Sequence, residues 1–492
     1  MPRDVHAVSF LAVLVLTAGC SRTPPERQLV DDAAAALGGA SRIRALKSIA
    51  VEGVADAPNV GQNRMPDSEL PNWRVTAYRR TTDLVNDRTD MTQARQAQFQ
   101  FAGALVQQQH QAQDGDVAVN YPPGGAPVRG TDAQARDRRR EALQHPIAVM
   151  KAALAESSQI TNLRQSGDQD VVDIRTSHGD VIQLFVSRTS KLPLQVAMLD
   201  ANPNLGDVVI ATAFSGYEAV NGVQMPKRLT TTIDKYPQFD LQVSKNAVDV
   251  DTTSLAAPAA VKSAPAAVPP PQVVTVEPVA KGIWRLAGSG NHRSIVFEFA
   301  DHLVLFEAPL NEVRSKAVID EARKLSSKPL THVIVSHHHF DHSGGLRVAV
   351  AEGLTIITHQ DNEEFFKQLV ARPWTVQPDA LAMAPRPLKL ELVDDTRTLK
   401  DATMEVQLYH LLDNPREGTN LFAYVPQGRL LVQADLYDNT WDRHLWGQNV
   451  LGNIERRKLK VDRDVPVHGA MEPFAKMVET IKAKPGTDYP VS

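Results

Sequence analysis

The sequence predicts two α+β domains, a curved antiparallel sheet followed by an αββα sandwich. At 492 residues the chain is too long for one ordinary domain. Residues 256–273 are rich in Ala and Pro, which predicts a semi-rigid extended linker between residues 20–255 and residues 274–492. From Val171 onward the first part shows strands and tight turns, whereas strands and helices alternate in the second part.

The first domain opens with an expected helix over Gln28–Leu37 and an expected strand over Ser48–Val54. A turn at residues 177–180 and the Asn-Gly pair at residues 221–222 predict consecutive hairpins. A helix over residues 136–156 is expected to cover one face of the sheet. On this pattern the domain resembles the half-barrel of lipoprotein-carrier and lipoprotein-sorting domains. That resemblance implies a concave face that binds an acyl chain or a peptide. The alternative, a sheet with a purely structural role, fits the pattern equally well.

The second domain opens with short strands, and a helix over about Glu312–Leu325 precedes a buried strand at Val333–Val335. Strand-then-helix order on both sides of that strand predicts two mixed sheets with helices outside. The expected first strands are Gly282–Leu286, Ser294–Phe299 and Leu303–Phe306.

Directly after the buried strand, residues 337–342 read His-His-His-Phe-Asp-His. Imidazoles and carboxylates are the ligands that zinc prefers, and a strand sends His337 and His339 to the same face. Asp341 and His342 lie on the following turn, from which they can reach a second ion. A solvated polyhistidine loop is the alternative, but chance rarely adds the Asp and the bend-permitting Gly pair at residues 344–345.

Residues 331–345 resemble the signature of the metallo-β-lactamase superfamily of zinc hydrolases, and the resemblance extends from about Val274 to the C-terminus. It implies one or two zinc ions, with Asp435 at the end of an apolar strand as the bridging ligand. It also implies that Glu307, at another strand end, orients the metal-binding loop. The alternative is that Glu307 makes purely structural hydrogen bonds at the end of its strand. The other implied ligands are Asp341, His342 and His468 for one ion, and His337 and His339 for the other.

The chain departs from the family pattern at Arg416, where relatives place another His. A guanidinium stays protonated and has no lone pair for zinc, so the site of His337 and His339 is expected to be weakened. His410 is an alternative replacement ligand. Arg416 is also a candidate for binding a substrate carboxylate or oxyanion, and His292, in a loop near the expected cleft, is a second candidate for substrate contact.

The resemblance implies a zinc-dependent hydrolase in which metal-bound hydroxide attacks the carbonyl of a small ester, lactone, thioester or β-lactam-type amide. Asp341 is the implied catalytic residue, which orients the nucleophile. The alternative is a catalytically degenerate periplasmic metal- or lipid-binding lipoprotein, which Arg416 and the carrier-like first domain favour. No flavin-binding or rubredoxin-like segment supports redox chemistry.

Residues 1–19 are expected to form a lipoprotein signal peptide, since the apolar run Val8–Ala18 leads to a lipobox-like ending at Cys20, the only cysteine. A lipidated Cys20, followed by Ser21, implies a periplasm-facing outer-membrane lipoprotein of the bacterial cell envelope, and plain secretion to the periplasm is the alternative. A net charge of -4 without a basic face argues against a nucleic-acid partner.

Overall fold

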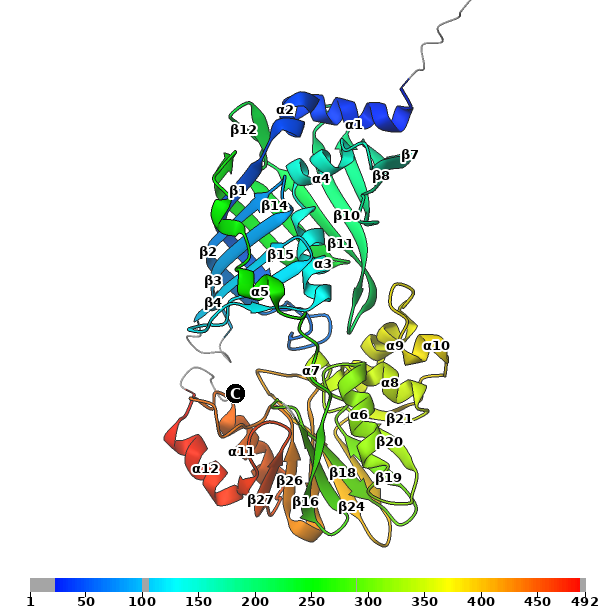
Figure 1. Cartoon of the computed structure of the whole chain (residues 1–492). Helices are drawn as coiled ribbons and strands as arrows, with labels where there is room; N and C mark the ends of the chain where they lie inside the picture. The colour runs from blue at the N-terminus through cyan, green and yellow to red at the C-terminus, as the bar shows by residue number, and fades with distance from the viewer. Residues whose placement is uncertain (1–22, 100–105, 289, 487–492) are drawn as a thin grey trace, which may run out of the picture.

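The computed structural model describes residues 23–99, 106–288 and 290–486. The expected signal peptide and Cys20 therefore lie outside the described residues. Two sheet domains follow each other along the chain, and the second packs against one end of the first (Figure 1). Among the described residues, no helix has the length and apolar character needed to cross a bilayer.

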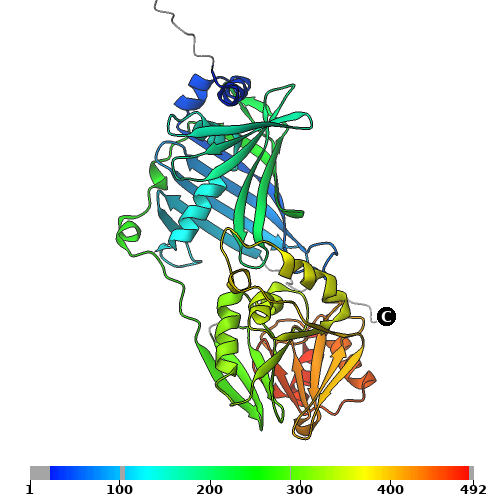
Figure 2. The same cartoon turned by 90° about the vertical axis from the view of Figure 1, so that its right-hand side faces the viewer.

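The first domain is one antiparallel sheet, in the order β6-β5-β4-β3-β2-β1-β15-β14-β11-β10-β9-β8-β7. The sheet curves strongly, and helix α3 (Asp132–Ala142) lies across its concave side (Figure 2). The strands are β1 (Ser48–Pro58), β2 (Asn72–Asp83), β3 (Arg88–Ala97), β4 (Val106–Asp114), β5 (Val117–Asn120), β6 (Val128–Arg129), β7 (Gln159–Ser166), β8 (Gln169–Arg175), β9 (Val181–Ser187), β10 (Pro193–Asn202), β11 (Gly206–Ser215), β14 (Arg228–Ile233) and β15 (Tyr236–Val248). The curved antiparallel sheet expected for the first domain is confirmed.

Three helices close the end of this sheet that lies away from the second domain: α1 (Pro25–Ala36), α2 (Ala40–Ala45) and α4 (Pro146–Ala153). Their apolar side chains share one core with β8, β9 and β10. The single helix expected over residues 136–156 is wrong, because the chain forms α3 and α4 instead. Pro146 disfavours helical geometry at the preceding residue, and His145 caps α4 by accepting a hydrogen bond from the N–H of Ile147 at 3.2 Å.

Two further expectations need correction. The Asn221-Gly222 turn closes only a small hairpin of β12 (Glu218–Val220) and β13 (Val223–Met225), whereas the long strands β11 and β14 pair directly with each other. The expected extended linker instead begins on the first domain, where short helix α5 (Ala259–Ser263) buries Val261 in an apolar cluster with β4 and β5.

The second domain contains two sheets packed face to face, one of seven strands and one of six. The apolar layer between them includes Phe297 and Phe306 from the first sheet and Leu408 and Val432 from the second. The strands are β16 (Val274–Ala280), β17 (Ile283–Gly288), β18 (Ser294–Glu298), β19 (Leu303–Phe306), β20 (Leu330–Ile334), β21 (Thr355–His359) and β22 (Leu390–Val393), then β23 (Thr396–Lys400), β24 (Glu405–His410), β25 (Leu421–Val425), β26 (Leu430–Gln433), β27 (Arg463–Pro466) and β28 (Glu472–Pro473).

Helices cover the outer face of each sheet, which confirms the αββα sandwich (Figure 1). On the seven-stranded sheet lie α6 (Glu312–Ala322), α8 (Leu346–Ala351), α9 (Glu363–Ala371) and α10 (Ala380–Met383), and on the six-stranded sheet lie α11 (Gly447–Arg456) and α12 (Phe474–Ala483).

The two domains share an interface with an apolar and a polar part. Leu205, Val208 and Ile233 of the first domain belong to the same apolar cluster as the α6, α8 and α9 side chains of the second. Beside this cluster, both carboxylate oxygens of Asp207 accept hydrogen bonds from the segment that begins at Thr375. Because apolar burial and hydrogen bonds act together here, the structure holds the end of the curved sheet close to the second domain.

Candidate metal centre

The predicted ligands come from strand ends that meet at one edge of the second domain. Residues 337–342 leave β20 and enter the short helix α7 (Phe340–Ser343), while Asp435 and His468 follow β26 and β27. Because β26 and β27 run parallel, their carboxyl ends lie side by side. Loops that leave the same edge of neighbouring strands can direct their side chains to one point.

Four of these side chains form a compact group. The Nε2 atom of His342 lies 3.3 Å from Oδ2 of Asp341, 3.1 Å from Oδ1 of Asp435 and 3.2 Å from Nε2 of His468. Tetrahedral zinc with bonds of about 2.0–2.1 Å places its ligand atoms about 3.3 Å apart. All four donor atoms lie within 4.8 Å of one another, so their chemistry and their grouping suit a zinc ion.

A second group shares Asp435 with the first. The Nε2 atom of His337 lies 3.0 Å from Nδ1 of His339 and 3.8 Å from Oδ2 of Asp435. Nη2 of Arg416 lies 3.7 Å from the same oxygen. Three donors are enough for a zinc ion that keeps one open position. However, the positive charge of Arg416 next to the shared Asp435 carboxylate opposes the binding of a metal ion there.

Each ligand imidazole has a polar protein atom near its second nitrogen, although that nitrogen of His342 makes no hydrogen bond. Nδ1 of His337 lies 2.8 Å from the Ser336 hydroxyl, Nδ1 of His342 lies 3.4 Å from Oε2 of Glu307, and Nδ1 of His468 lies 2.5 Å from the Asn291 carbonyl oxygen. Nε2 of His339 lies 2.8 Å from Oε2 of Glu417. Such partners set the tautomer and orientation of metal-binding histidines.

Two residues of the centre have a strained backbone. Glu307 and Asp435, neither of them glycine, have φ values of 78° and 60°. This left-handed region costs about 1–3 kcal/mol for such residues and persists where the surroundings enforce it. At both strand ends the turn directs a carboxylate into the centre, which indicates that the strain serves the site.

The electrostatics of the four-residue group favour a positive charge at its middle. Burial alone would lower the pKa of His342, but the carboxylates of Asp341 and Asp435 outweigh burial and raise that pKa well above its usual value. Burial would raise the pKa of both acids, yet the His342 charge holds each well below its usual range. Burial and the neighbouring charge of His342 lower the pKa of His337, so its imidazole is neutral, as a metal ligand must be.

The predicted substrate contacts differ in their surroundings. His292 lies at the rim of the centre, with Nε2 3.5 Å from Oδ2 of Asp341, and its side chain is partly exposed. Arg416 is buried and donates to the Gln62 side chain at 2.6 Å. His410, the alternative ligand, lies outside the two groups, because its ring contacts His359 and its Nε2 lies 2.9 Å from the Gly418 carbonyl oxygen.

Two contributions to the centre were missed from the sequence. Glu417 contacts both His338 and His339, and its position directly after Arg416, in the segment where relatives carry a histidine, was an available signal. The second contribution is the loop of residues 59–71, which comes from the first domain and contacts the centre through Gln62 and Asn63. No sequence pattern connects that loop to the metal ligands.

The comparisons with known proteins identify this domain. Residues 288–432 match the model of the Metallo-beta-lactamase superfamily, so the C-terminal part of the chain contains a metallo-β-lactamase superfamily domain. No curated protein matches the sequence.

Solved structures similar to the chain include two metallo-β-lactamases and a sec-alkylsulfatase. A metallo-β-lactamase from Pontibacter korlensis is 13% identical, with 43% of this chain and 98% of that chain covered and a TM-score of 0.35. The metallo-β-lactamase FIM-1 from Pseudomonas aeruginosa, in a mono-zinc form, is 15% identical, with 43% and 96% covered and a TM-score of 0.34. The sec-alkylsulfatase Pisa1 from a Pseudomonas species is 17% identical, with 43% and 40% covered and a TM-score of 0.34.

Proposed function

We propose that this protein is a zinc-dependent hydrolase that acts on the carbonyl of a small ester, lactone, thioester or β-lactam-type amide. The observation that carries the proposal is the close grouping of the donor atoms of Asp341, His342, Asp435 and His468, which all lie within 4.8 Å of one another. A catalytic zinc needs three protein donors and one open position, and this group of four residues supplies at least that number of donors.

The bound metal would lower the pKa of water to about 7 and polarise the substrate carbonyl. The protein itself must bring water and substrate to the same side of the centre. Asp341 and His292 have side-chain exposures of 26% and 24%, whereas His337 and His339 are fully buried. The substrate therefore enters from the Asp341–His292 side.

Asp341 is placed to orient the attacking water. The charge of His342 outweighs burial and holds the pKa of the Asp341 carboxyl well below its usual range, and a metal ion bound in place of the His342 proton would act in the same direction. Oδ1 of Asp341 accepts a hydrogen bond from Gln62 at 2.8 Å, and its Oδ2 faces His292 and His342. An ionised oxygen held by neighbours on both sides accepts a hydrogen bond from water in a defined direction.

A substrate panel with and without a chelator tests this function. Chromogenic esters, lactones, thioesters and β-lactams are offered to the zinc-loaded full-length protein, with the Asp341→Asn variant as the matched control. We expect turnover of at least one class that is lost on chelation, restored by zinc and abolished in the variant. Turnover that is insensitive to the chelator, or unchanged in Asp341→Asn, would contradict the proposal.

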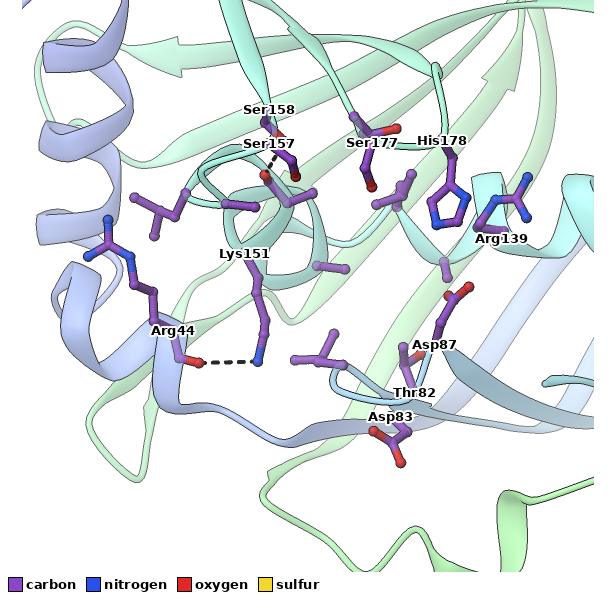
Figure 3. Close-up of a pocket in the computed structure, with 18 of the residues that line it drawn as sticks. Arg44, Thr82, Asp83, Asp87, Arg139, Lys151, Ser157, Ser158, Ser177 and His178 are labelled. Carbon is purple, nitrogen blue, oxygen red and sulfur yellow. Dashed lines mark hydrogen bonds between the residues drawn. The ribbon is translucent and has the colours of Figure 1, made fainter. Parts of the chain in front are cut away.

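A second candidate is a metal- or lipid-binding lipoprotein without catalytic activity, which a cavity in the first domain favours. This cavity of about 490 Å³ has alanine and leucine side chains on its walls and Arg44, Lys151 and His178 among its polar lining (Figure 3). A mainly apolar lining that includes a few charged groups suits an amphipathic molecule. Tight zinc binding without turnover on the whole panel would favour this candidate.

We also propose that the chain is anchored as a periplasm-facing outer-membrane lipoprotein through lipidated Cys20. The lipobox-like sequence that ends at Cys20 supports this placement. Mass spectrometry of the mature N-terminus tests it, since a diacylated or triacylated Cys20 is expected and an unmodified Cys20 would refute the anchor.

A further inference from the structure

The loop of residues 59–71 connects β1 to β2 in the first domain, but its polar groups end at the metal centre of the second. Gln62 makes two contacts with different partners there. Its Nε2 donates to Oδ1 of Asp341 at 2.8 Å, while its Oε1 accepts from Nη2 of Arg416 at 2.6 Å. The Gln62 side chain therefore orients Asp341 and also holds the Arg416 guanidinium beside Asp435.

The next residue reaches the second group. The Asn63 carbonyl oxygen lies 2.8 Å from Nε2 of His339, where Glu417 also approaches. A hydrogen on that nitrogen leaves the lone pair of Nδ1 free on the side that faces His337. The Asn63 carbonyl thus supports the tautomer in which His339 can act as a ligand.

The loop is built to stay in this position. The Asn63 amide donates to the carbonyl oxygens of Met65 and Pro66 at 2.5 and 2.9 Å, which shapes the turn. The N–H of Gly418 donates to the Arg64 carbonyl oxygen at 2.9 Å, which ties the loop to the segment that carries Glu417.

Close approach requires glycine at one point of the loop. Gly61 has a φ of 77°, and a Cβ atom added there would lie 2.3 Å from Cδ2 of Phe340, inside the metal-binding segment. A side chain at this position would therefore displace either the loop or Phe340.

We propose that the first domain completes the metal centre, and that Gln62 is a positioning residue for Asp341 and Arg416. This inference rests on the proposed metal-dependent function and goes beyond it, because it assigns the first domain a direct part in the site. Removing an outer partner of a metal ligand typically costs about 10–100-fold in metal affinity. We expect the Gln62→Met substitution, which keeps the side-chain length and loses both polar contacts, to cost about 10-fold.

The test measures metal binding by the full-length protein and needs no substrate. Zinc affinity is measured by competition with a chromophoric chelator for the wild type, Gln62→Met, Gly61→Ala and the control Glu69→Gln, an exposed position in the same loop. Cobalt(II) is then substituted, and its visible absorption spectrum is recorded for each protein. A purely structural loss lowers the amount of bound cobalt, whereas a changed ligand orientation also shifts the band.

The inference predicts weaker zinc binding and a shifted cobalt band in Gln62→Met and Gly61→Ala, with the control identical to the wild type. If Gln62→Met is too unstable to measure, Gly61→Ala alone decides. A wild type that binds zinc, beside loop variants with unchanged affinity and spectrum, would overturn this inference and leave the proposed function standing. A wild type that binds no zinc would overturn both.

Discussion

Oδ1 of Asp435 lies 3.0 Å from Nε2 of His468, although the two residues follow different strands. The parallel pairing of β26 with β27 creates this contact, because it brings both strand ends to the same edge. The other carboxylate oxygen of Asp435 faces His337 at 3.8 Å. Asp435 is therefore the residue that joins the two groups of donors.

Replacing Asp435 with Ala is expected to abolish tight zinc binding. The four-residue group loses one donor, and the His337–His339 group loses its only carboxylate. The loss of zinc affinity should therefore exceed the about 10–100-fold that is typical when a hydrogen-bond partner of a metal ligand is removed. Isothermal titration with zinc measures it. Asp442→Asn, at an exposed position in the segment after Asp435, serves as the control, and zinc affinity of Asp435→Ala within twofold of that control would refute the bridging role.

Glu307 is expected to matter without binding metal itself. Its carboxylate lies 3.4 Å from Nδ1 of His342 and accepts a hydrogen bond from the N–H of Ser336 at 3.1 Å. Glu307→Gln keeps the shape and removes the charge, so zinc affinity should fall by about 10-fold. Glu298→Gln, on the neighbouring strand β18, is the matched change away from the centre, and equal affinities of the two variants would show that Glu307 has no such role.

Arg416→His is expected to strengthen the second site. The substitution removes the guanidinium that lies 3.7 Å from Asp435 and supplies an imidazole in its place. A zinc titration followed by calorimetry should show a second tight binding event per chain. Arg416→Met separates the two causes, since it removes the charge and adds no ligand; if both variants bind zinc as the wild type does, Arg416 does not limit the site.

His145 is expected to make the first domain sensitive to acid. Burial lowers its pKa to about 3, with a further contribution from the charge of Arg80. Because the folded pKa is depressed below the usual 6.5, the unfolded chain binds a proton that the folded chain does not, and stability falls as pH drops below about 6.5. The loss approaches about 1.4 kcal/mol per pH unit for one proton.

Urea unfolding at pH 7 and pH 5 checks this dependence. His145→Asn keeps an acceptor at the start of α4 and does not titrate, so its free energy of unfolding should fall less between these pH values than that of the wild type. His178→Asn, in an exposed turn, should behave as the wild type does. An equal pH dependence in His145→Asn and the wild type would contradict the prediction.

Much of the second domain could be predicted because its signals are local. The ligand-rich loop follows a buried strand directly, and Asp435 and His468 each follow an apolar strand, so their order along the chain carries the information. The structure brings all six predicted ligands together. The position of Glu417 directly after Arg416 was a signal for its role, but the contact of its carboxylate with His339 forms only in the folded segment.

The contributions of the first domain could not be predicted in the same way. Gln62 lies far from Asp341 in sequence, and only the packing of one domain on the other brings them within hydrogen-bonding distance. The errors in the first domain have a different origin. Pro146 was a visible signal for the end of a helix, whereas the packing of Val261 on the sheet depends on tertiary contacts that composition does not encode.

The zinc content of the purified full-length protein shows whether the strand-end side chains bind a metal ion. The protein is stripped with a chelator, reloaded with zinc, dialysed and analysed by inductively coupled plasma mass spectrometry beside Asp435→Ala. We expect at least one zinc per wild-type chain and almost none in the variant. A wild type that retains no more zinc than Asp435→Ala would contradict this expectation.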